Sequence, residues 1–85
     1  MITKQLTLYY FDECPFCQRV LKCINKLHLK VSYVNIMQDP AGREKLLNDT
    51  GKKTVPCLYI DNHPMFESSD IIHWLEKNAE SLAKE

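Results

Sequence analysis

The chain has 85 residues, which is enough for one small domain with a single core, and we treat residues 1–85 as one domain. Eleven basic residues balance eleven acidic ones without forming a basic stripe, which disfavours nucleic-acid binding. No apolar run reaches the roughly twenty residues of a membrane span, and the first residues do not resemble a signal peptide. We therefore expect a cytoplasmic protein whose four cysteines are free or catalytic.

Apolar spacing in the first third of the chain predicts a strand, a helix and a second strand. Residues 6–11 alternate as in a central strand, and apolar side chains recur at helical spacing over residues 15–29. Residues 31–36 form the second predicted strand, which the intervening helix makes parallel to the first. The face of this helix that we expect to meet water carries Gln18, Arg19, Lys22 and Lys26.

A second helix follows, and both of its ends are marked in the sequence. Asp39, placed before Pro40, is the predicted N-cap, and Gly51 is the predicted end. Leu46 and Leu47 are expected to form its buried side.

The apolar run that ends at Ile60 begins with a proline, Pro56. Proline does not fit the start of an internal strand unless the backbone there is unusual, and a cis Val55–Pro56 bond resolves the conflict. That geometry would leave the Val55 backbone free to pair with an extended peptide. Residues 61–63 form a predicted tight turn, and residues 64–67 a short returning strand.

The last helix begins in a polar triad. Ser68, Ser69 and Asp70 supply N-cap chemistry, although exposed N–H groups at a helix start also suit a ligand carboxylate. On the residues alone we favour the cap. The predicted buried stripe of this helix contains Ile71, Ile72, Leu75, Ala79 and Leu82.

The most informative motif is Cys14-Pro15-Phe16-Cys17, which joins the first strand to the first helix. The positive end of a helix stabilises a thiolate, and Cys14 lies where that effect is strongest. Pro15 suits the first helical position, because the N–H that proline lacks has no intrahelical partner there. One helical turn brings Cys17 back to Cys14, which predicts an exposed dithiol that can open and close.

Two other interpretations of the cysteines were weighed. A zinc site needs a second ligand pair, but Cys23 and Cys57 stand alone and the three histidines form no closely spaced pair, so no metal is expected. A structural disulfide across so short a loop would add little stability. Redox chemistry is therefore favoured, with Cys23 as a half-buried apolar residue and Cys57 as a buried strand residue.

With these motifs in this order, nearly the whole chain resembles a glutaredoxin. The combination of C-P-F-C, T-V-P about forty residues later and a Ser-Asp helix start is far more specific than C-x-x-C alone. The resemblance implies an α/β thioredoxin fold, in which a four-stranded mixed sheet is flanked by three helices in the order strand, helix, strand, helix, strand, strand, helix.

The resemblance also implies roles for individual residues. Cys14 is similar in position to the family's nucleophile and Cys17 to its resolving thiol. Val55, before Pro56, corresponds to the backbone that holds the cysteine of glutathione. The residues that correspond to the grip on its γ-glutamyl end are Ser69 and Asp70.

This chain departs from glutaredoxins before the first cysteine. Phe11 stands where those proteins commonly carry a lysine, and Asp12 and Glu13 add two carboxylates. These carboxylates should oppose a thiolate at Cys14 and repel the glycine carboxylate of glutathione. Either the affinity for glutathione is lower, or Lys52 or Lys53 supplies the missing charge.

A second departure is the absence of the Gly-Gly pair that precedes the last helix in glutaredoxins. Residues 65–71 are instead similar to the glutathione-site segment in N-terminal domains of glutathione transferases. That similarity adds Glu67 and Ser68 to the candidates for the γ-glutamyl site. The helical domain that would bind a second substrate is not seen, which argues against transferase activity.

These observations predict a monomeric, glutathione-dependent thiol–disulfide oxidoreductase that reduces protein disulfides or protein–glutathione mixed disulfides and maintains cell redox homeostasis. No nucleic-acid or membrane partner is expected. One alternative is an electron donor recycled by thioredoxin reductase, which the missing lysine favours and the segment from Glu67 to Asp70 disfavours. Another is an iron–sulfur carrier that shares a cluster through Cys14 and two glutathiones, which Pro15 disfavours.

Overall fold

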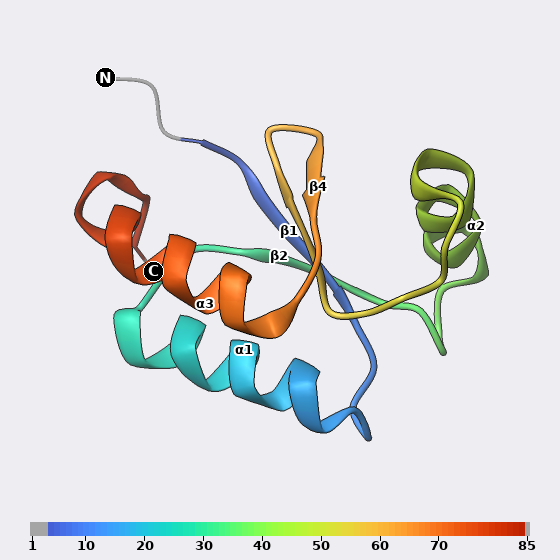
Figure 1. The fold of residues 1–85 in the computed structure, drawn as a ribbon, viewed down its shortest axis with the longest axis horizontal. Helices are drawn as coiled ribbons and strands as arrows, with labels where there is room; N and C mark the ends of the chain where they lie inside the picture. Colours follow the sequence, from blue (N-terminus) through green and yellow to red (C-terminus); the bar gives the residue numbers. More distant parts are fainter. Residues whose placement is uncertain (1–3, 85) are drawn as a thin grey trace.

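The computed structural model describes residues 4–84, so the N-terminal residues 1–3 used in the signal-peptide argument lie outside it. Strands and helices follow one another in the predicted order (Figure 1). The elements are β1 (Leu6–Tyr10), α1 (Pro15–Leu27), β2 (Ser32–Asn35), α2 (Pro40–Thr50), β3 (Cys57–Ile60), β4 (His63–Met65), α3 (Ser68–Asn78) and a short 3-10 turn, η1 (Ala79–Ser81).

The strands form one mixed sheet in the order β2-β1-β3-β4, which confirms the predicted α/β thioredoxin fold. β1 lies at the centre, parallel to β2 and antiparallel to β3, so that Leu8 has Tyr33 on one side and Leu58 on the other. The β3–β4 hairpin turns through Asp61 and Asn62, both with positive φ, at 49° and 74°. Such a turn follows the right-handed twist of the strands it joins.

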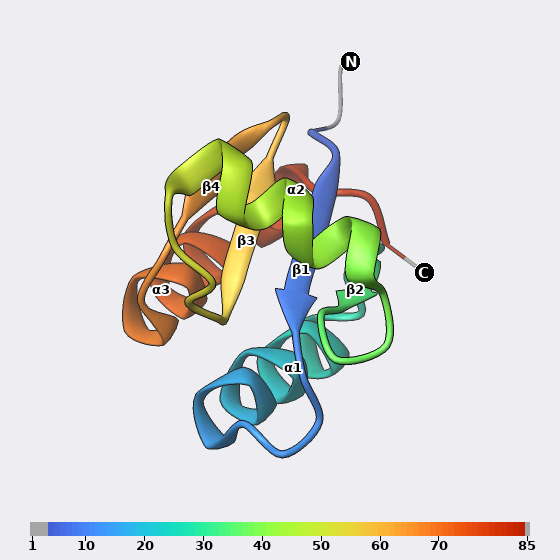
Figure 2. The same ribbon diagram turned by 90° about the vertical axis from the view of Figure 1, so that its right-hand side faces the viewer.

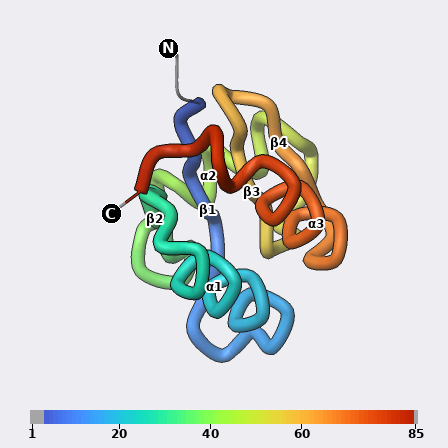
Figure 3. Tube along the Cα trace, turned by 90° about the vertical axis from the view of Figure 1, so that its left-hand side faces the viewer, coloured from blue at the N-terminus to red at the C-terminus, as the bar shows by residue number. Residues whose placement is uncertain are grey.

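Side-chain alternation along the strands divides the core into two layers. Leu8 and Leu58 face α1 and α3, whereas Tyr9 and Cys57 face Leu46 of α2. Figure 2 shows α2 in front of the sheet, and Figure 3 shows α1 and α3 side by side on the opposite face. The catalytic candidates therefore lie where a helix from one layer leaves the end of the central strand.

The C-terminal segment returns to the sheet after α3. The Lys30 amide donates to the Ala83 carbonyl at 2.9 Å, and Leu29 forms a bridge with Lys84. Figure 3 shows this segment running back toward the start of β2. Leu82, which belongs to the predicted apolar stripe, is buried there in the layer that α1 and α3 cover.

Several element boundaries differ from the sequence prediction by one to two residues. The first helix ends at Leu27 rather than Leu29, because His28 adopts a left-handed conformation with φ of 56° and donates its amide to helix carbonyls. This turn lets Leu29 enter the core. The second strand is confined to Ser32–Asn35, and the last to His63–Met65.

The ends of α2 are as predicted, but its buried side is narrower. Asp39 caps the helix by accepting a hydrogen bond from the Gly42 amide at 3.0 Å, and Gly51 ends it with φ of 75°. Leu46 is fully buried, whereas Leu47 is 37% exposed, so the prediction for Leu47 was wrong. Successive helical residues point about 100° apart, so the sheet, which lies on one side of α2, covers Leu46 and leaves Leu47 partly exposed.

The carboxylate of Asp49 links α2 to the sheet through a hydrogen bond with Tyr59 of β3. Its carboxylate accepts hydrogen bonds from Lys45 Nζ at 2.5 Å and from the buried Tyr59 hydroxyl at 2.9 Å. The hydrogen bond from Lys45 is the largest of the causes that hold the pKa of Asp49 below its usual range, and the hydrogen bond from Tyr59 is the second. A carboxyl with a lowered folded-state pKa stabilises the fold above its unfolded pKa and loses that contribution as the pH falls through its folded pKa.

We expect Asp49→Asn to unfold at a lower urea concentration than the unsubstituted protein at neutral pH, because the ionised carboxylate favours the folded state. The two midpoints should converge well below the ordinary aspartate pKa of about 3.9. Glu44→Gln is the matched control, since Glu44 lies on the same helix and takes part in no ion pair within residues 4–84. A gap that stays constant as the pH falls would contradict the electrostatic explanation.

Candidate active site

Cys14 occupies the N-cap of α1, the position predicted from the sequence. Its Sγ accepts a hydrogen bond from the Cys17 amide at 3.3 Å, and Pro15 takes the first helical position. The Cys14 amide donates to the Phe11 carbonyl at 3.3 Å, which closes the turn between β1 and α1. A sulfur that accepts a backbone N–H at a helix N-terminus is stabilised in its anionic form.

The two thiols are less accessible than the sequence suggested. Both are free, but Cys14 is 6% exposed and Cys17 is fully buried, so the prediction of an exposed dithiol was wrong. Cys17 lies on the same face of α1 as Val20 and Ile24, which turns its side chain into the core. Cys14, as the N-cap, keeps a small opening to solvent.

Burial makes the two cysteines chemically unequal. Burial, together with the hydrogen bond between the Cys17 thiol and Cys14, raises the pKa of Cys17 to about 12. Cys17 is therefore a neutral thiol near pH 7 and directs a proton toward the Cys14 sulfur. This arrangement favours Cys14 as the nucleophile of the pair.

A hollow of about 290 Å³ lies beside the start of α1. It brings together three segments of the chain: the first turns of α1, the stretch before β3 and the start of α3. The Val55–Pro56 bond in its wall is cis, as predicted. The lining residues are Phe16, Arg19, Thr54, Val55, Pro56, Glu67, Ser68 and Ser69.

The start of α3 corrects the predicted cap. The helix begins at Ser68, so the Ser68-Ser69-Asp70 triad forms its first turn, and the N-cap is Glu67 with φ of 72° and no side-chain capping bond. Serine and aspartate are common both at N-caps and in first turns, and the backbone of Glu67 decided between the two. The N-terminal amides of α3 are thus left without a side-chain cap at the edge of the hollow.

Comparison with known proteins identifies the family. The family described as glutathione S-transferase, N-terminal domain, matches residues 8–82, which contain both cysteines and every residue of the hollow. The chain belongs to the glutathione S-transferase N-terminal domain family. The two resemblances drawn from the sequence, to glutaredoxins and to this domain, are confirmed.

Individual relatives of this chain differ from it in length. Glutaredoxin 2 of Escherichia coli K12 is 32% identical over 73 residues, which are 85% of this chain and 33% of that protein. The chain thus spans about a third of that curated relative. A glutathione transferase homolog from Drosophila mojavensis, solved with bound glutathione, is 25% identical with a TM-score of 0.74 and covers 91% of this chain and 36% of its own.

A wheat glutaredoxin has the same fold at similar size. It superposes with a TM-score of 0.70, and the match covers 94% of this chain and 83% of the wheat protein at 20% identity. The relatives are glutaredoxins and glutathione transferases, so this domain belongs to a glutathione-related group of proteins.

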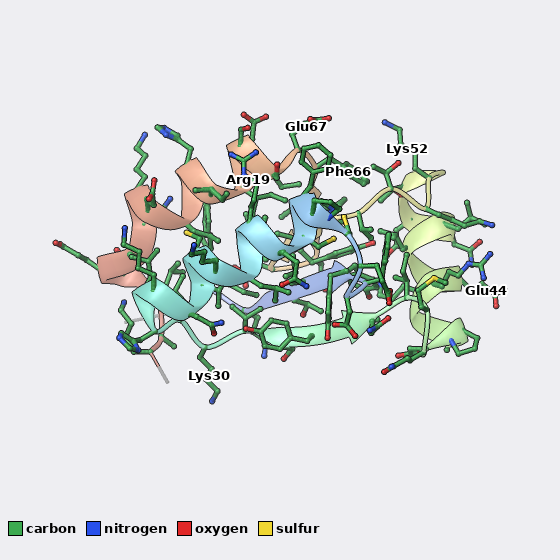
Figure 4. The ribbon with its side chains drawn as sticks, turned by 90° about the horizontal axis from the view of Figure 1, so that it is seen from below. Arg19, Lys30, Glu44, Lys52, Phe66 and Glu67 are labelled. Atoms are coloured by element: carbon green, nitrogen blue, oxygen red, sulfur yellow. The ribbon has the colours of Figure 1, made fainter. Side chains whose placement is uncertain are left out.

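Three of the predicted binding residues lie outside the hollow of this N-terminal domain. Lys52 Nζ lies 5.3 Å from the centre of the Phe66 ring, close to Glu67 in Figure 4. Lys53 lines a separate hollow beside α2, and Asp70 is an exposed residue in the first turn of α3. Of the two lysines considered for the missing charge, Lys52 is therefore on the side of the hollow.

Sequence reasoning missed three residues of the hollow. Phe16, 57% exposed, and Arg19 lie on the same face of α1, and Thr54 precedes Val55. Arg19 was expected only to face water. Its spacing of three from Phe16, next to the first cysteine, is the signal that could have identified it, because residues three apart share a helix face.

The described part of this domain holds no group of three His, Cys, Asp or Glu side chains arranged for a metal ion. Within residues 4–84, no helix has the length and apolar content that crossing a bilayer demands. A larger hollow, of about 360 Å³, lies at the other end of β1 between Lys4 and Lys30 and does not include the cysteines.

Proposed function

We propose that this domain is a glutathione-dependent thiol–disulfide oxidoreductase that acts on protein disulfides and protein–glutathione mixed disulfides. The observation that carries the proposal is the pairing of Cys14, an N-cap sulfur that accepts a backbone N–H, with a neighbouring hollow lined by Val55, Glu67 and Ser68. In the cell this activity would maintain redox homeostasis in the cytoplasm, with the domain working as a monomer.

With a protein–glutathione mixed disulfide, the reaction begins with attack by the Cys14 thiolate on the glutathione sulfur. A Cys14–glutathione disulfide forms and the substrate's other sulfur leaves as a thiolate, which takes a proton from water. The thiolate of a second glutathione then attacks the glutathione sulfur of this intermediate. Glutathione disulfide forms and Cys14 is released as a thiolate, so one free glutathione and the mixed disulfide have become glutathione disulfide and a protein thiol. A protein disulfide first forms a Cys14–protein disulfide, and its reduction oxidises two free glutathiones to glutathione disulfide.

Cys17 offers a second route out of the intermediate. Its thiol, after losing its proton, would attack Cys14 Sγ, release glutathione and leave a Cys14–Cys17 disulfide. Because burial raises the pKa of Cys17 to about 12, this route is slow at neutral pH. Glutathione is thus the main resolving thiol in the proposed mechanism.

The proposed binding residues divide between the parts of glutathione. The backbone of Val55, before Pro56, pairs with the cysteine of the tripeptide. The amides and side chains at the start of α3 bind its γ-glutamyl end, and lysine ammonium groups bind its glycine carboxylate. The residues proposed for the γ-glutamyl end are Glu67, Ser68, Ser69 and Asp70. Those proposed for the glycine carboxylate are Lys52 and Lys53.

The proposal is tested by supplying electrons in two ways. With a small glutathione mixed disulfide as substrate, we expect turnover when glutathione, NADPH and glutathione reductase are present. We expect none when thioredoxin reductase replaces glutathione and its reductase. The reverse pattern would overturn glutathione as the electron source.

One observation favours recycling by thioredoxin reductase as a second candidate. Asp12 and Glu13 are both exposed in the turn before Cys14, and Asp12 accepts a hydrogen bond from the Asn35 side chain at 3.4 Å, which holds one carboxylate near the site. Glutathione is a net anion, so these carboxylates disfavour it over a protein donor. The same pair of assays separates the two candidates.

A further inference from the structure

The hollow beside α1 carries one cation and one anion. Among its eight lining residues, only Arg19 and Glu67 have charged side chains. Figure 4 shows Arg19 extending from α1 toward the N-terminal part of α3, the helix that Glu67 directly precedes. Yet the ion pairs found within residues 4–84 join Lys4 to Asp61 and Lys45 to Asp49, so the two charges of the hollow are not paired.

A buried hydroxyl, that of Ser68, lines the same hollow directly after Glu67 in the sequence. Ser68 is 7% exposed and is the one buried polar residue in the described part of the chain. Its hydroxyl has no hydrogen-bond partner among the described residues. No side-chain polar atom that is sealed from solvent lacks a partner there, so the Ser68 hydroxyl keeps contact with solvent through the hollow that it lines.

These groups match a ligand that carries both charges on neighbouring atoms. A guanidinium binds a carboxylate through paired hydrogen bonds, and uncapped helix amides also donate hydrogen bonds to an anion. A carboxylate binds an ammonium group. The head of an α-amino acid carries one ammonium and one carboxylate, which is the charge pattern that Arg19, Ser68 and Glu67 complement.

We propose that Arg19 binds the α-carboxylate of the γ-glutamyl group, whose ammonium group is left to Glu67, a residue that the proposed function already places at this end of glutathione. The inference rests on the proposed function and deepens it. Glutathione has an amino-acid head at only one end, whereas its glycine end carries a carboxylate alone. The hollow therefore fixes the direction of the tripeptide, with its γ-glutamyl end at α3 and its cysteine at Val55.

Binding to a protein that cannot react tests Arg19 directly. The Cys14→Ser protein is titrated with S-methylglutathione and with S-methylcysteinylglycine, which lacks the γ-glutamyl group. Adding Arg19→Ala should weaken binding of the first about tenfold, because a charge-assisted hydrogen bond pair is lost, and should leave binding of the second unchanged. Arg19→Lys should recover part of the loss, since it keeps the charge without the planar fork.

Arg43→Ala is the matched control. Arg43 is the chain's other arginine, is exposed on α2 and lines a different hollow. It should change neither affinity. In turnover assays with the native cysteines, Arg19→Ala should raise KM for glutathione about tenfold and keep kcat, because the lost contact is present before and during the reaction.

The outcomes separate this inference from the proposed function. If the unsubstituted protein turns over with glutathione while Arg19→Ala changes neither KM nor the affinity for S-methylglutathione, the role of Arg19 is wrong and the oxidoreductase stands. Equal weakening of both probes by Arg19→Ala would also overturn the role, since it would show no selectivity for the γ-glutamyl head. Absence of both turnover and binding in the unsubstituted protein would overturn the two proposals together.

Discussion

Replacing Cys14 with serine should lower the turnover of a glutathione mixed disulfide by about a thousandfold or more, whereas Cys17→Ser should keep turnover within about threefold. A serine hydroxyl stays protonated at neutral pH and cannot attack a disulfide sulfur, so the first step is lost in Cys14→Ser. The measurement is NADPH consumption with glutathione and glutathione reductase.

The asymmetry follows from where the two sulfurs lie. The Cys14 sulfur accepts a hydrogen bond from the Cys17 amide at the N-terminus of α1 and keeps a small exposed fraction. Cys17 is fully buried, and burial contributes to raising its pKa to about 12. In the proposed mechanism a second glutathione resolves the intermediate, so Cys17 is not required for turnover. Cys17→Ser also removes the slow side reaction that forms the Cys14–Cys17 disulfide, which draws enzyme away from the main cycle.

Cys23→Ala is the matched control for these variants. Cys23 lies on the same helix, is buried at the margin of the core, and makes no contribution to the proposed chemistry. Its turnover should equal that of the unsubstituted protein. Full activity in Cys14→Ser would refute the assignment of the nucleophile. A loss in Cys17→Ser as large as that in Cys14→Ser would show that the intramolecular disulfide is an obligatory step.

Local signals in the sequence were sufficient to predict most of the fold. The alternation of Leu6, Leu8 and Tyr10 and the helical spacing after Pro15 are periodic over enough residues to identify β1 and α1. The right-handed crossover rule then makes β2 parallel to β1. The cis Val55–Pro56 bond was predictable because proline does not fit the start of an internal strand unless the backbone there is unusual.

The errors arose where tertiary contacts decide between equally good local choices. Leu46 and Leu47 are equally apolar, and only the direction of the sheet buries one of them. The triad from Ser68 to Asp70 satisfies the rules for a cap and for a first turn, and the positive φ of Glu67 set the boundary. A positive φ in a residue other than glycine is uncommon and is not signalled by the glutamate itself.

The candidate site shows the same limit. Cys14 and Cys17 were predictable because their spacing is local, and Val55 and Glu67 were named from resemblance to known families. Arg19 was missed, since its contribution to the hollow depends on α3 lying beside α1, which no local pattern in α1 reports. Long-range packing of this kind also buried the dithiol that the sequence suggested was exposed.

Burial should slow alkylation of Cys17 and Cys57 about a thousandfold relative to an ordinary thiol, which leaves Cys14 as the first cysteine to react. Near pH 8, about a quarter of an ordinary thiol with a pKa of about 8.5 is thiolate, against about one part in ten thousand of a thiol whose pKa is about 12. Burial raises the pKa of Cys17 and of Cys57 to about 12, and raises that of Cys23 as well. Iodoacetamide should therefore modify Cys14 first in the folded protein.

Mass spectrometry after a timed exposure gives the site and extent of modification. One adduct, at Cys14, is expected in buffer, and four adducts are expected in concentrated urea, where burial no longer protects the other thiols. Raising the pH should speed modification of Cys17 and Cys57, because a larger fraction of each ionises as the pH approaches its raised pKa. Modification of Cys17 at the same rate as Cys14 near pH 8 would contradict its burial as a neutral thiol.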